Sequence, residues 1–185
     1  CNLINCTFID NAAINSGGAI YSKSKSSNIN DCIFTNNYAG NSGGAIKSDG
    51  ECVLNLNDCS FIDNSAKYGA GIYSYYLINL INCEFVNNAA INQGSAGAVY
   101  IYKDGNVSNC YFINNSAFRG GAVYGNFYLN DCICTDNNAD YGGAFYIKNE
   151  TRDMKSTIIN CNFTNNIAKV SGGGVYTYFN TTCDL

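Results

Sequence analysis

The chain consists of one motif that recurs seven times at intervals of 22 to 29 residues. The motif reads L-x-[N/D]-C-x-F-x-x-N-x-A, and after a short spacer it is followed by G-G-A-[I/V]-Y. Its cysteines are Cys6, Cys32, Cys59, Cys83, Cys110, Cys132 and Cys161. Self-similarity at a period of about 20–50 residues is typical of solenoids, propellers and arrays. We therefore expect residues 1–185 to form one domain, a stack of similar units.

Within each copy the pattern predicts short strands separated by corners. Cys and Phe alternate with a period of two, so both side chains leave the same face of a strand. Cys134 is the exception, because it stands where the other copies have Phe. Asn or Asp before the cysteine, and Asn five residues after it, tolerate left-handed conformations and predict corners, as at Asn109 and Asn115. The glycine block opens a further strand, and no segment shows a helical period over helical length.

Two kinds of solenoid fit this pattern. A right-handed parallel β-helix winds each copy into about three short strands, and its coils stack about 4.8 Å apart. Cys, Phe and Asn then form ladders through seven to eight coils, with Cys183 opening the last one. A leucine-rich repeat overlays Leu80 to Ala90, but its other half needs a helix or a 3₁₀ turn, and each interior Gly costs a helix about 1 kcal/mol. We predict an all-β, single-stranded parallel β-helix, with the leucine-rich repeat as the alternative.

The composition excludes several classes of function. The net charge is −4 and the ten Lys and Arg are scattered, which argues against nucleic acid as a partner. No apolar run approaches the roughly 18–20 residues of a membrane helix, so we expect no direct membrane insertion by this segment. The chain has no His and no C-x-x-C pair. We therefore predict no catalytic residue, no metal site and no cofactor.

The repeat resembles those of known surface proteins. F-x-x-N paired with G-G-A-[I/L/V], as in Phe112 to Asn115 and Gly120 to Val123, is similar to the repeats of the chlamydial polymorphic outer-membrane proteins. The version rich in Asn and Tyr, with a Cys before the Phe, resembles adhesin-like surface proteins of methanogenic archaea. The resemblance covers nearly the whole chain. It implies the pectate-lyase-like class of right-handed β-helix and a surface-displayed, adhesin-type stalk, and it identifies no binding site.

The cysteines can be read in more than one way. Eleven is an odd number, so at least one thiol is unpaired within this chain. Neighbouring coils place Cα atoms within disulfide range, but parallel Cβ vectors keep the Cβ atoms about 4.8 Å apart, beyond the usual mean of about 3.8 Å. We predict that the ladder cysteines are small buried hydrophobes, with ladder disulfides as the alternative. A bond between Cys1 and Cys52, which lie off the ladder, is a further alternative.

Two carboxylates are candidates for chemistry. Asp31 and Asp58 occupy the same slot of adjacent coils, which puts their carboxylates about 5 Å apart. β-Helical polysaccharide lyases and hydrolases use Asp clusters, often with Ca²⁺ or a basic residue. The same slot carries Asn in other copies, and no Lys or Arg recurs beside it. We predict that both residues are corners, with a catalytic pair as the alternative.

A column of tyrosines is the candidate ligand-binding surface. Its members are Tyr21, Tyr73, Tyr100, Tyr124, Tyr146 and Tyr176, with Lys47 in the second position. Each follows the apolar residue of the glycine block, so strand alternation points it outward if the apolar residue points inward. Tyr75, Tyr102 and Tyr178 follow two residues later on the same face. Stacked rings with hydroxyls can bind glycans or proteins, whereas the alternatives are stacking that only stabilises the sheet and rings that point inward.

These observations predict a non-enzymatic stalk or scaffold segment of a secreted or cell-surface adhesin-like protein, at the cell wall or outer membrane. Its expected partner is a surface glycan or a protein receptor. The alternative is part of a carbohydrate-active enzyme of the polysaccharide lyase or hydrolase type. The chain starts and stops inside its own repeat, so we expect a fragment whose open ends can self-associate end to end. If the protein is exported, Asn149 and Asn180 are the expected glycan attachment sites.

Overall fold

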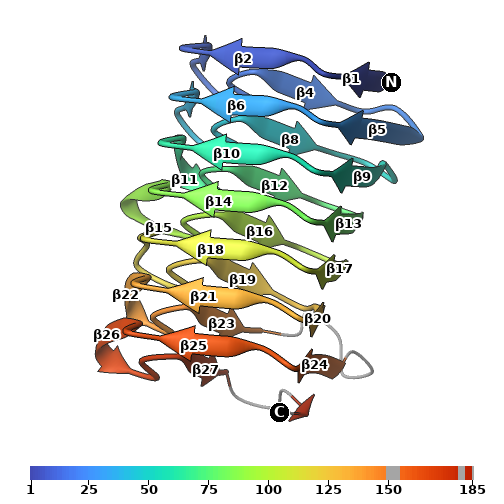
Figure 1. The fold of residues 1–185 in the computed structure, drawn as a ribbon. Coiled ribbons are helices and arrows are strands. Elements are labelled where there is room, and N and C mark those ends of the chain that lie inside the picture. The colour runs from blue at the N-terminus through green and yellow to red at the C-terminus, as the bar shows by residue number, and fades with distance from the viewer. Residues whose placement is uncertain (149–154, 179–181, 185) are drawn as a thin grey trace.

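The computed structural model describes residues 1–148, 155–178 and 182–184, and these residues form a stack of parallel strands without a helix. The chain crosses the front, returns behind and moves down by one coil each time, and Figure 1 shows that this winding is right-handed. The predicted all-β, right-handed parallel β-helix is confirmed. The stack makes about six turns, slightly fewer than the seven to eight coils expected. Asn149 and Asn180 lie outside the described residues.

Equivalent strands of successive coils pair in parallel and form sheets along the axis. Sheet A holds β1 (Asn2–Ile4), β5 (Ser26–Asn30), β9 (Val53–Asn57), β13 (Leu77–Ile81), β17 (Asp104–Ser108), β20 (Tyr128–Asn130), β24 (Lys155–Ile159) and β28 (Thr182–Asp184). Sheet B holds β2 (Thr7–Ile9), β6 (Ile33–Thr35), β10 (Ser60–Ile62), β14 (Glu84–Val86), β18 (Tyr111–Ile113), β21 (Ile133–Thr135) and β25 (Asn162–Thr164).

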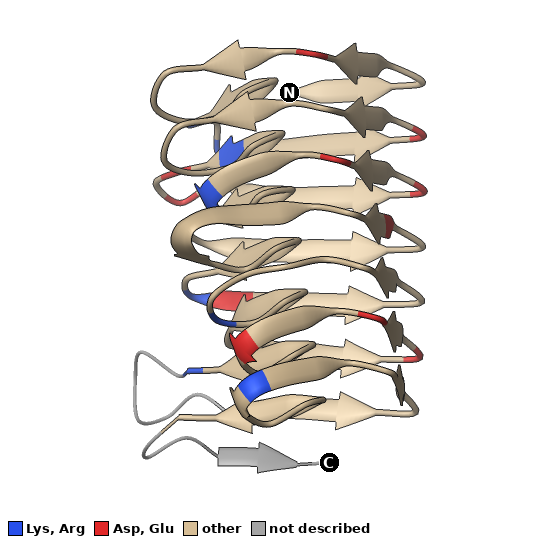
Figure 2. Ribbon diagram, turned by 90° about the vertical axis from the view of Figure 1, so that its left-hand side faces the viewer, with Lys and Arg blue, Asp and Glu red and all other residues tan. Residues whose placement is uncertain are grey.

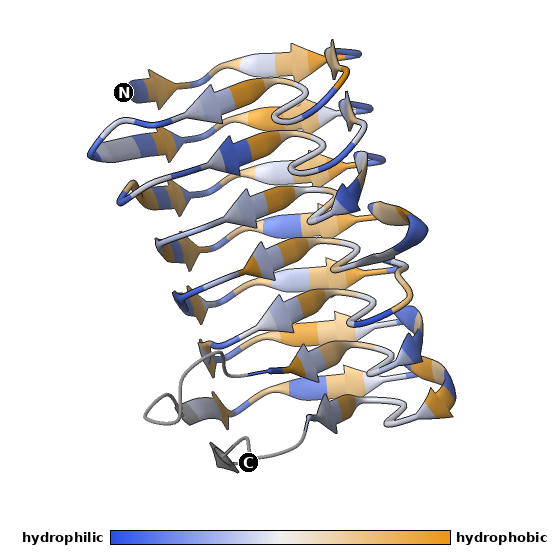
Figure 3. Ribbon diagram, turned by 180° about the vertical axis from the view of Figure 1, so that it is seen from behind, coloured by the Kyte–Doolittle hydropathy of each residue, from blue (hydrophilic) through white to orange (hydrophobic). Residues whose placement is uncertain are grey.

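The return path of each coil forms the remaining sheets. Sheet C holds β3 (Ala12–Ala13), β7 (Tyr38–Ala39), β11 (Ser65–Tyr68) and β15 (Ala89–Ser95), and β22 (Asn138–Tyr141) with β26 (Ile167–Ser171) continues it as a separate pair. Sheet D holds β4 (Ile20–Ser22), β8 (Ile46–Ser48), β12 (Ile72–Ser74), β16 (Val99–Ile101), β19 (Val123–Gly125), β23 (Phe145–Ile147) and β27 (Val175–Thr177). Figure 3 shows apolar and polar residues alternating along these strands, as expected when one face of a strand is buried.

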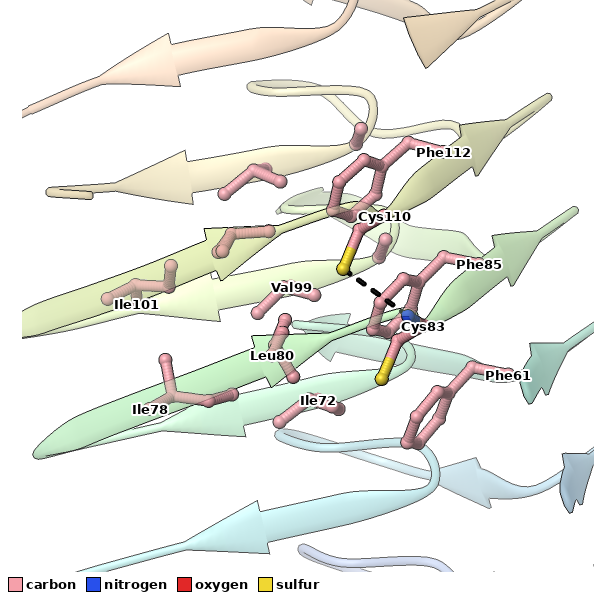
Figure 4. Packing of buried hydrophobic residues seen from close by; sticks show 14 of the residues in the cluster. Phe61, Ile72, Ile78, Leu80, Cys83, Phe85, Val99, Ile101, Cys110 and Phe112 are labelled. Atoms are coloured by element: carbon pink, nitrogen blue, oxygen red, sulfur yellow. Dashed lines mark hydrogen bonds between the residues drawn. The ribbon is translucent and has the colours of Figure 1, made fainter. Parts of the chain in front are cut away.

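The interior is filled by ladders of apolar side chains, as predicted. The phenylalanine ladder consists of Phe8, Phe34, Phe61, Phe85 and Phe112, whose neighbouring rings stack with centroids 4.7 to 5.1 Å apart. The repeat cysteines form a parallel column beside it (Figure 4), where the Cys83 backbone N–H lies 3.4 Å from the Cys110 Sγ. Aliphatic residues such as Leu80 and Val99 close the opposite wall.

The phenylalanine ladder is interrupted at Cys134, and a side chain from sheet D fills the space. Cys134 is paired between Phe112 and Phe163. In the same coil Phe145 stands where the other coils have Ile or Val, and its ring lies edge-on to Phe112 at 6.0 Å and to Phe163 at 5.2 Å. Phe127 adds a further edge contact at 5.4 Å. The ring of Phe145 therefore occupies the volume that Cys134 gives up.

Left-handed Asn and Asp residues turn the chain at two places in each coil, and the first residue of the glycine block, such as Gly120 with a φ of 64°, is left-handed at a third. One is the Asn or Asp directly before the repeat cysteine, as predicted, and Asn109 there has a φ of 52°. The other is the Asn or Asp four residues after the cysteine, such as Asn114 with a φ of 53°. Asn115, which the sequence predicts as the corner, lies one residue past it and is fully buried. Its side chain points inward because its amide bonds backbone groups that the turn leaves unpaired.

These inward-pointing residues form an inner asparagine ladder. Its members are Asn11, Asn37, Asn64, Asn88, Asn115, Asn137 and Asn166. The Asn88 Oδ1 accepts hydrogen bonds from the backbone N–H and from the side-chain amide of Asn64, both over 3.0 Å. The Asn88 Nδ2 donates to the Phe61 carbonyl over 2.9 Å. The ladder thus satisfies buried backbone groups at each corner, which the predicted stacking of Asn on Asn did not specify.

An outer asparagine ladder runs along the exposed face of sheet A. Its members are Asn2, Asn28, Asn55, Asn79 and Asn106, whose Nδ2 and Oδ1 atoms lie 2.7 to 2.9 Å apart between neighbours. Gly44, the second glycine of its block, has a different task, because it lies against the next coil. A Cβ on Gly44 would lie 2.2 Å from the Ala70 carbonyl oxygen, so no other residue fits there without moving the backbone.

The cysteines whose side chains the structure describes are free thiols, and those of the middle coils are buried, as predicted. The proposed Cys1–Cys52 bond is wrong, because Cys1 is exposed while the thiol of buried Cys52 lies beside the Ser22 and Ser27 hydroxyls. Cys183 does not open an eighth copy. β28 pairs it with Ser156, which lies five residues before the repeat cysteine of its own coil.

Candidate functional site

The tyrosine column of sheet D points away from the core. The apolar residue before each tyrosine is buried in the interior, as Ile72 and Val99 show, and strand alternation then turns the next side chain outward. Among the described residues, no tyrosine of this column belongs to the interior cluster. We call Tyr21, Tyr73, Tyr100, Tyr124, Tyr146 and Tyr176, with Lys47 in the second position, the tyrosine ladder.

From Tyr73 onward the rings of the ladder stack on one another. Neighbouring centroids lie 4.7 to 5.0 Å apart along this part of the column. Tyr75 and Tyr102 form a second stack beside it at 4.8 Å, and the Lys103 ammonium lies 5.7 Å from the Tyr75 centroid. Stacking that stabilises the sheet is therefore one real function of these rings.

Exposure differs sharply along the ladder. Tyr124 is 8% exposed and Tyr146 is 4% exposed, whereas Tyr21 is 47% exposed. The middle of the ladder is covered by residues just before the glycine blocks: the Tyr68 ring meets Tyr100 edge-on at 6.0 Å, and Tyr141 packs against the cluster that holds Tyr124 and Tyr146. Burial, together with the neighbouring Tyr124, raises the pKa of Tyr146 to about 12. The middle rings are thus mainly structural, and Tyr21 is the most open member.

The ladder is broken at Lys47, and a recess opens at this break. Lys47 is paired between Tyr21 and Tyr73, and its ammonium lies 4.8 Å from the Tyr73 centroid. The recess measures about 500 Å³, and we call it the Lys47 recess. It is lined by Asn15, Ser16, Tyr21, Asn41, Lys47 and Asp49. Aromatic, carboxylate, ammonium and amide groups therefore meet at one place.

Asp49 is held in position inside the Lys47 recess. The Tyr21 hydroxyl donates to its Oδ2 over 2.8 Å, and the Gly50 backbone N–H donates to its Oδ1 over 2.9 Å. The hydrogen bond from Tyr21 keeps the pKa of the Asp49 carboxyl below its ordinary value. Sequence reasoning placed Tyr21 on this face but missed Asp49, Asn15 and Asn41. The 26-residue interval between the two asparagines was the available signal.

Comparison with known proteins identifies the repeat. The family model of the Chlamydia polymorphic membrane protein repeat matches residues 5–23, 31–49, 58–75 and 160–178. Each matched segment begins at or next to the corner before a repeat cysteine and ends just past a ladder position. Four coils of this solenoid are therefore similar to that repeat. These segments cover less than half of the chain, and no curated protein and no solved structure matches it.

Two aspartates of the matched coils serve as corners. Asp31 and Asp58 have φ values of 52° and 51°, which the corner prediction requires. Asp58 accepts a hydrogen bond from the Asn82 amide over 3.1 Å and another from Asn57. It also lines a shallow recess of about 350 Å³ with Glu84 and Tyr111. Asp31 and Asp58 are therefore corner residues.

Charge and metal chemistry add little elsewhere on the solenoid. In Figure 2 the right-hand side of the coils carries acidic residues alone, whereas basic and acidic residues occur together on the left-hand side. No group of three or more acidic or cysteine side chains among the described residues is arranged to hold a metal ion. The described residues also contain no helix that is long and apolar enough to cross a membrane.

Proposed function

We propose that this chain is a non-enzymatic β-helical stalk of a surface-displayed, adhesin-like protein. The observation that carries the proposal is the match of four coils to a repeat of the polymorphic membrane proteins. The architecture supports it, because every coil repeats the same core, corners and ladders and so adds length rather than a new site. The protein would be located at the cell wall or outer membrane.

The stalk would meet its partner, a surface glycan or a protein receptor, through the open part of the tyrosine ladder. Support comes from the exposure of Tyr21 and from the mixed chemistry around it. The closed middle of the ladder, where Tyr146 is 4% exposed, would keep the rod stiff. Tyrosine is well suited to such contacts because it offers an apolar ring and a polar hydroxyl.

Surface display is testable on intact cells that produce the protein. We expect a protease added outside the cells to remove epitopes of the β-helix, while a cytoplasmic marker stays intact. Cell lysis before protease treatment serves as the positive control. Protection of the epitopes in intact cells, with digestion only after lysis, would contradict surface display.

A second candidate function is cleavage of a polysaccharide, which the recess at Asp58 and Glu84 favours because it brings two carboxylates to one surface. Incubation with a panel of polyuronides and neutral polysaccharides, followed by reducing-end analysis, separates the two functions. We expect the chain to bind a polysaccharide without producing new reducing ends, that is, without cleaving it. Cleavage that is lost in Asp58→Asn would establish the enzyme instead.

A further inference from the structure

We propose that the Lys47 recess is a binding site for one pyranose unit of a neutral glycan. This inference rests on the proposed surface function and names the site and the ligand class within it. The tyrosine ladder alone would offer only a row of rings. The break at Lys47 adds a cavity, hydrogen-bonding groups and an open ring at the same position.

The first requirement of a sugar site is an accessible aromatic face, and Tyr21 provides it. In the rest of the ladder each ring is covered by the ring of the next coil at about 4.8 Å. Tyr21 stacks on no other ring within the part of the chain that the structure describes, since Lys47 occupies the adjoining position. The Lys23 ammonium lies 5.5 Å from the Tyr21 centroid, so a sugar would share the ring with this side chain or displace it. A half-exposed ring (47%) can therefore pack against the apolar C–H face of a pyranose.

The second requirement is a set of polar groups at fixed positions. The Asp49 carboxylate is oriented by two hydrogen bonds, from Tyr21 and from the Gly50 backbone. Each carboxylate oxygen has two acceptor positions, so one on each remains for a sugar hydroxyl. Asn15 and Asn41 sit one coil apart on the rim, joined by a backbone hydrogen bond of 2.7 Å. Their amides supply both donors and acceptors.

The third requirement is a match of size and charge. About 500 Å³ lies within the range of about 300–1,000 Å³ that small-molecule sites occupy. Lys47 and Asp49 bring one charge of each sign to the lining, and the Lys23 ammonium lies over the Tyr21 ring, 5.5 Å from its centroid. An acidic sugar would bring its own carboxylate close to Asp49, and that repulsion disfavours it. A neutral hexose or N-acetylhexosamine fits these groups best.

Saturation-transfer NMR on the whole chain tests the proposal. The probes are the methyl glycosides of glucose, galactose, mannose and N-acetylglucosamine, with glucuronic acid as the charged comparison. We expect at least one neutral probe to bind, and Tyr21→Ala and Asp49→Asn each to weaken it about tenfold or more, as loss of a hydrogen bond to a charged group predicts. Tyr128→Ala is the matched control, because Tyr128 is 45% exposed on sheet A, and it should bind like the unaltered chain.

One variant separates loss of binding from loss of folding. In Lys47→Tyr the new ring would stack on Tyr73 and Tyr21 and complete the ladder. We expect it to abolish binding while the urea midpoint of unfolding stays the same or rises. Binding that survives in Lys47→Tyr, or in both Tyr21→Ala and Asp49→Asn, would overturn the site. The site would also be overturned if glucuronic acid bound more tightly than the neutral probes, or if no neutral probe bound. Neither result changes the expected outcome of the surface-display experiment.

Discussion

The inner asparagine ladder allows a quantitative prediction for Asn88→Ala. The Asn88 side chain is fully buried in a central coil and makes four hydrogen bonds. Two of them go to backbone groups, the Asn64 N–H and the Phe61 carbonyl. The substitution removes all four bonds at a side chain that is 0% exposed.

The expected cost follows from the groups left without a partner. A buried polar group that loses its hydrogen bond costs about 1–3 kcal/mol. With two backbone groups affected, and two amides of the ladder each losing one bond, we expect Asn88→Ala to lower the free energy of unfolding by about 3–5 kcal/mol. That is a large part of the roughly 5–15 kcal/mol by which domains are stable.

Asn79→Ala is the matched control, because Asn79 belongs to the same coil and also bonds an asparagine on each side, over 2.7 and 2.9 Å. Asn79 is only half-buried, so water can take over its bonds and the cost should stay below about 1 kcal/mol. Urea unfolding followed by circular dichroism measures both variants, and linear extrapolation yields the difference. Hydrogen exchange at the Asn64 amide reports the local opening.

The reasoning would be refuted if Asn88→Ala and Asn79→Ala cost the same. Equal costs would mean that the inner ladder is not the source of corner stability and that burial does not decide the value of these amides. A large loss of stability in both variants would indicate instead that both asparagine ladders stabilise the fold by aligning the strands, whether or not they are buried.

Three further predictions concern packing, pH and thiol access. Cys134→Phe should destabilise the chain by about 1–3 kcal/mol through overpacking against Phe145, and adding Phe145→Val should restore most of the loss in urea unfolding. The pKa of Tyr146 is raised from 10.0 to about 12 in the fold. The neutral Tyr146 side chain therefore contributes its full stability below pH 10, and this contribution is lost as the pH rises toward 12. Tyr146→Phe should make the urea midpoint of unfolding decline less between pH 10 and 12. Burial raises the pKa of the Cys134 thiol, so N-ethylmaleimide should label exposed Cys1 in the native chain and Cys134 only after unfolding. Peptide mass spectrometry measures both reactions. Rapid labelling of Cys134 in the native chain would contradict its buried position.

Most of the fold was predictable because the repeat shows which residues of successive coils are paired. Once Cys83 and Phe85 are placed on one strand face, the matching residues of the next coil follow, and the structure pairs Phe85 with Phe112 as expected. The corner residue was placed less accurately. Asn114 and Asn115 are adjacent and identical, and only the geometry of the turn decides which one is left-handed and which one points inward.

The candidate site was harder to predict than the fold. Strand alternation gave the outward direction of the tyrosines, but the burial of Tyr146 depends on turn residues whose path has no period in the sequence. Asp49 lies in a segment of variable length after β8, so no alignment of copies could place it against Tyr21. Such contacts depend on loop conformation, which a repeat pattern does not encode.

The inner asparagine ladder also has a direction, and this bears on how such a chain can change over generations. Between asparagines each amide nitrogen donates to the coil that follows, as Asn37 donates to Asn64 and Asn64 to Asn88, while its second hydrogen bond goes to a carbonyl of the preceding coil. The bonds to backbone groups fix this sense, so an amide cannot reverse. A coil duplicated or deleted as a whole leaves a donor facing an acceptor at the new junction. The gene can therefore lengthen or shorten the rod by whole coils without designing a new interface.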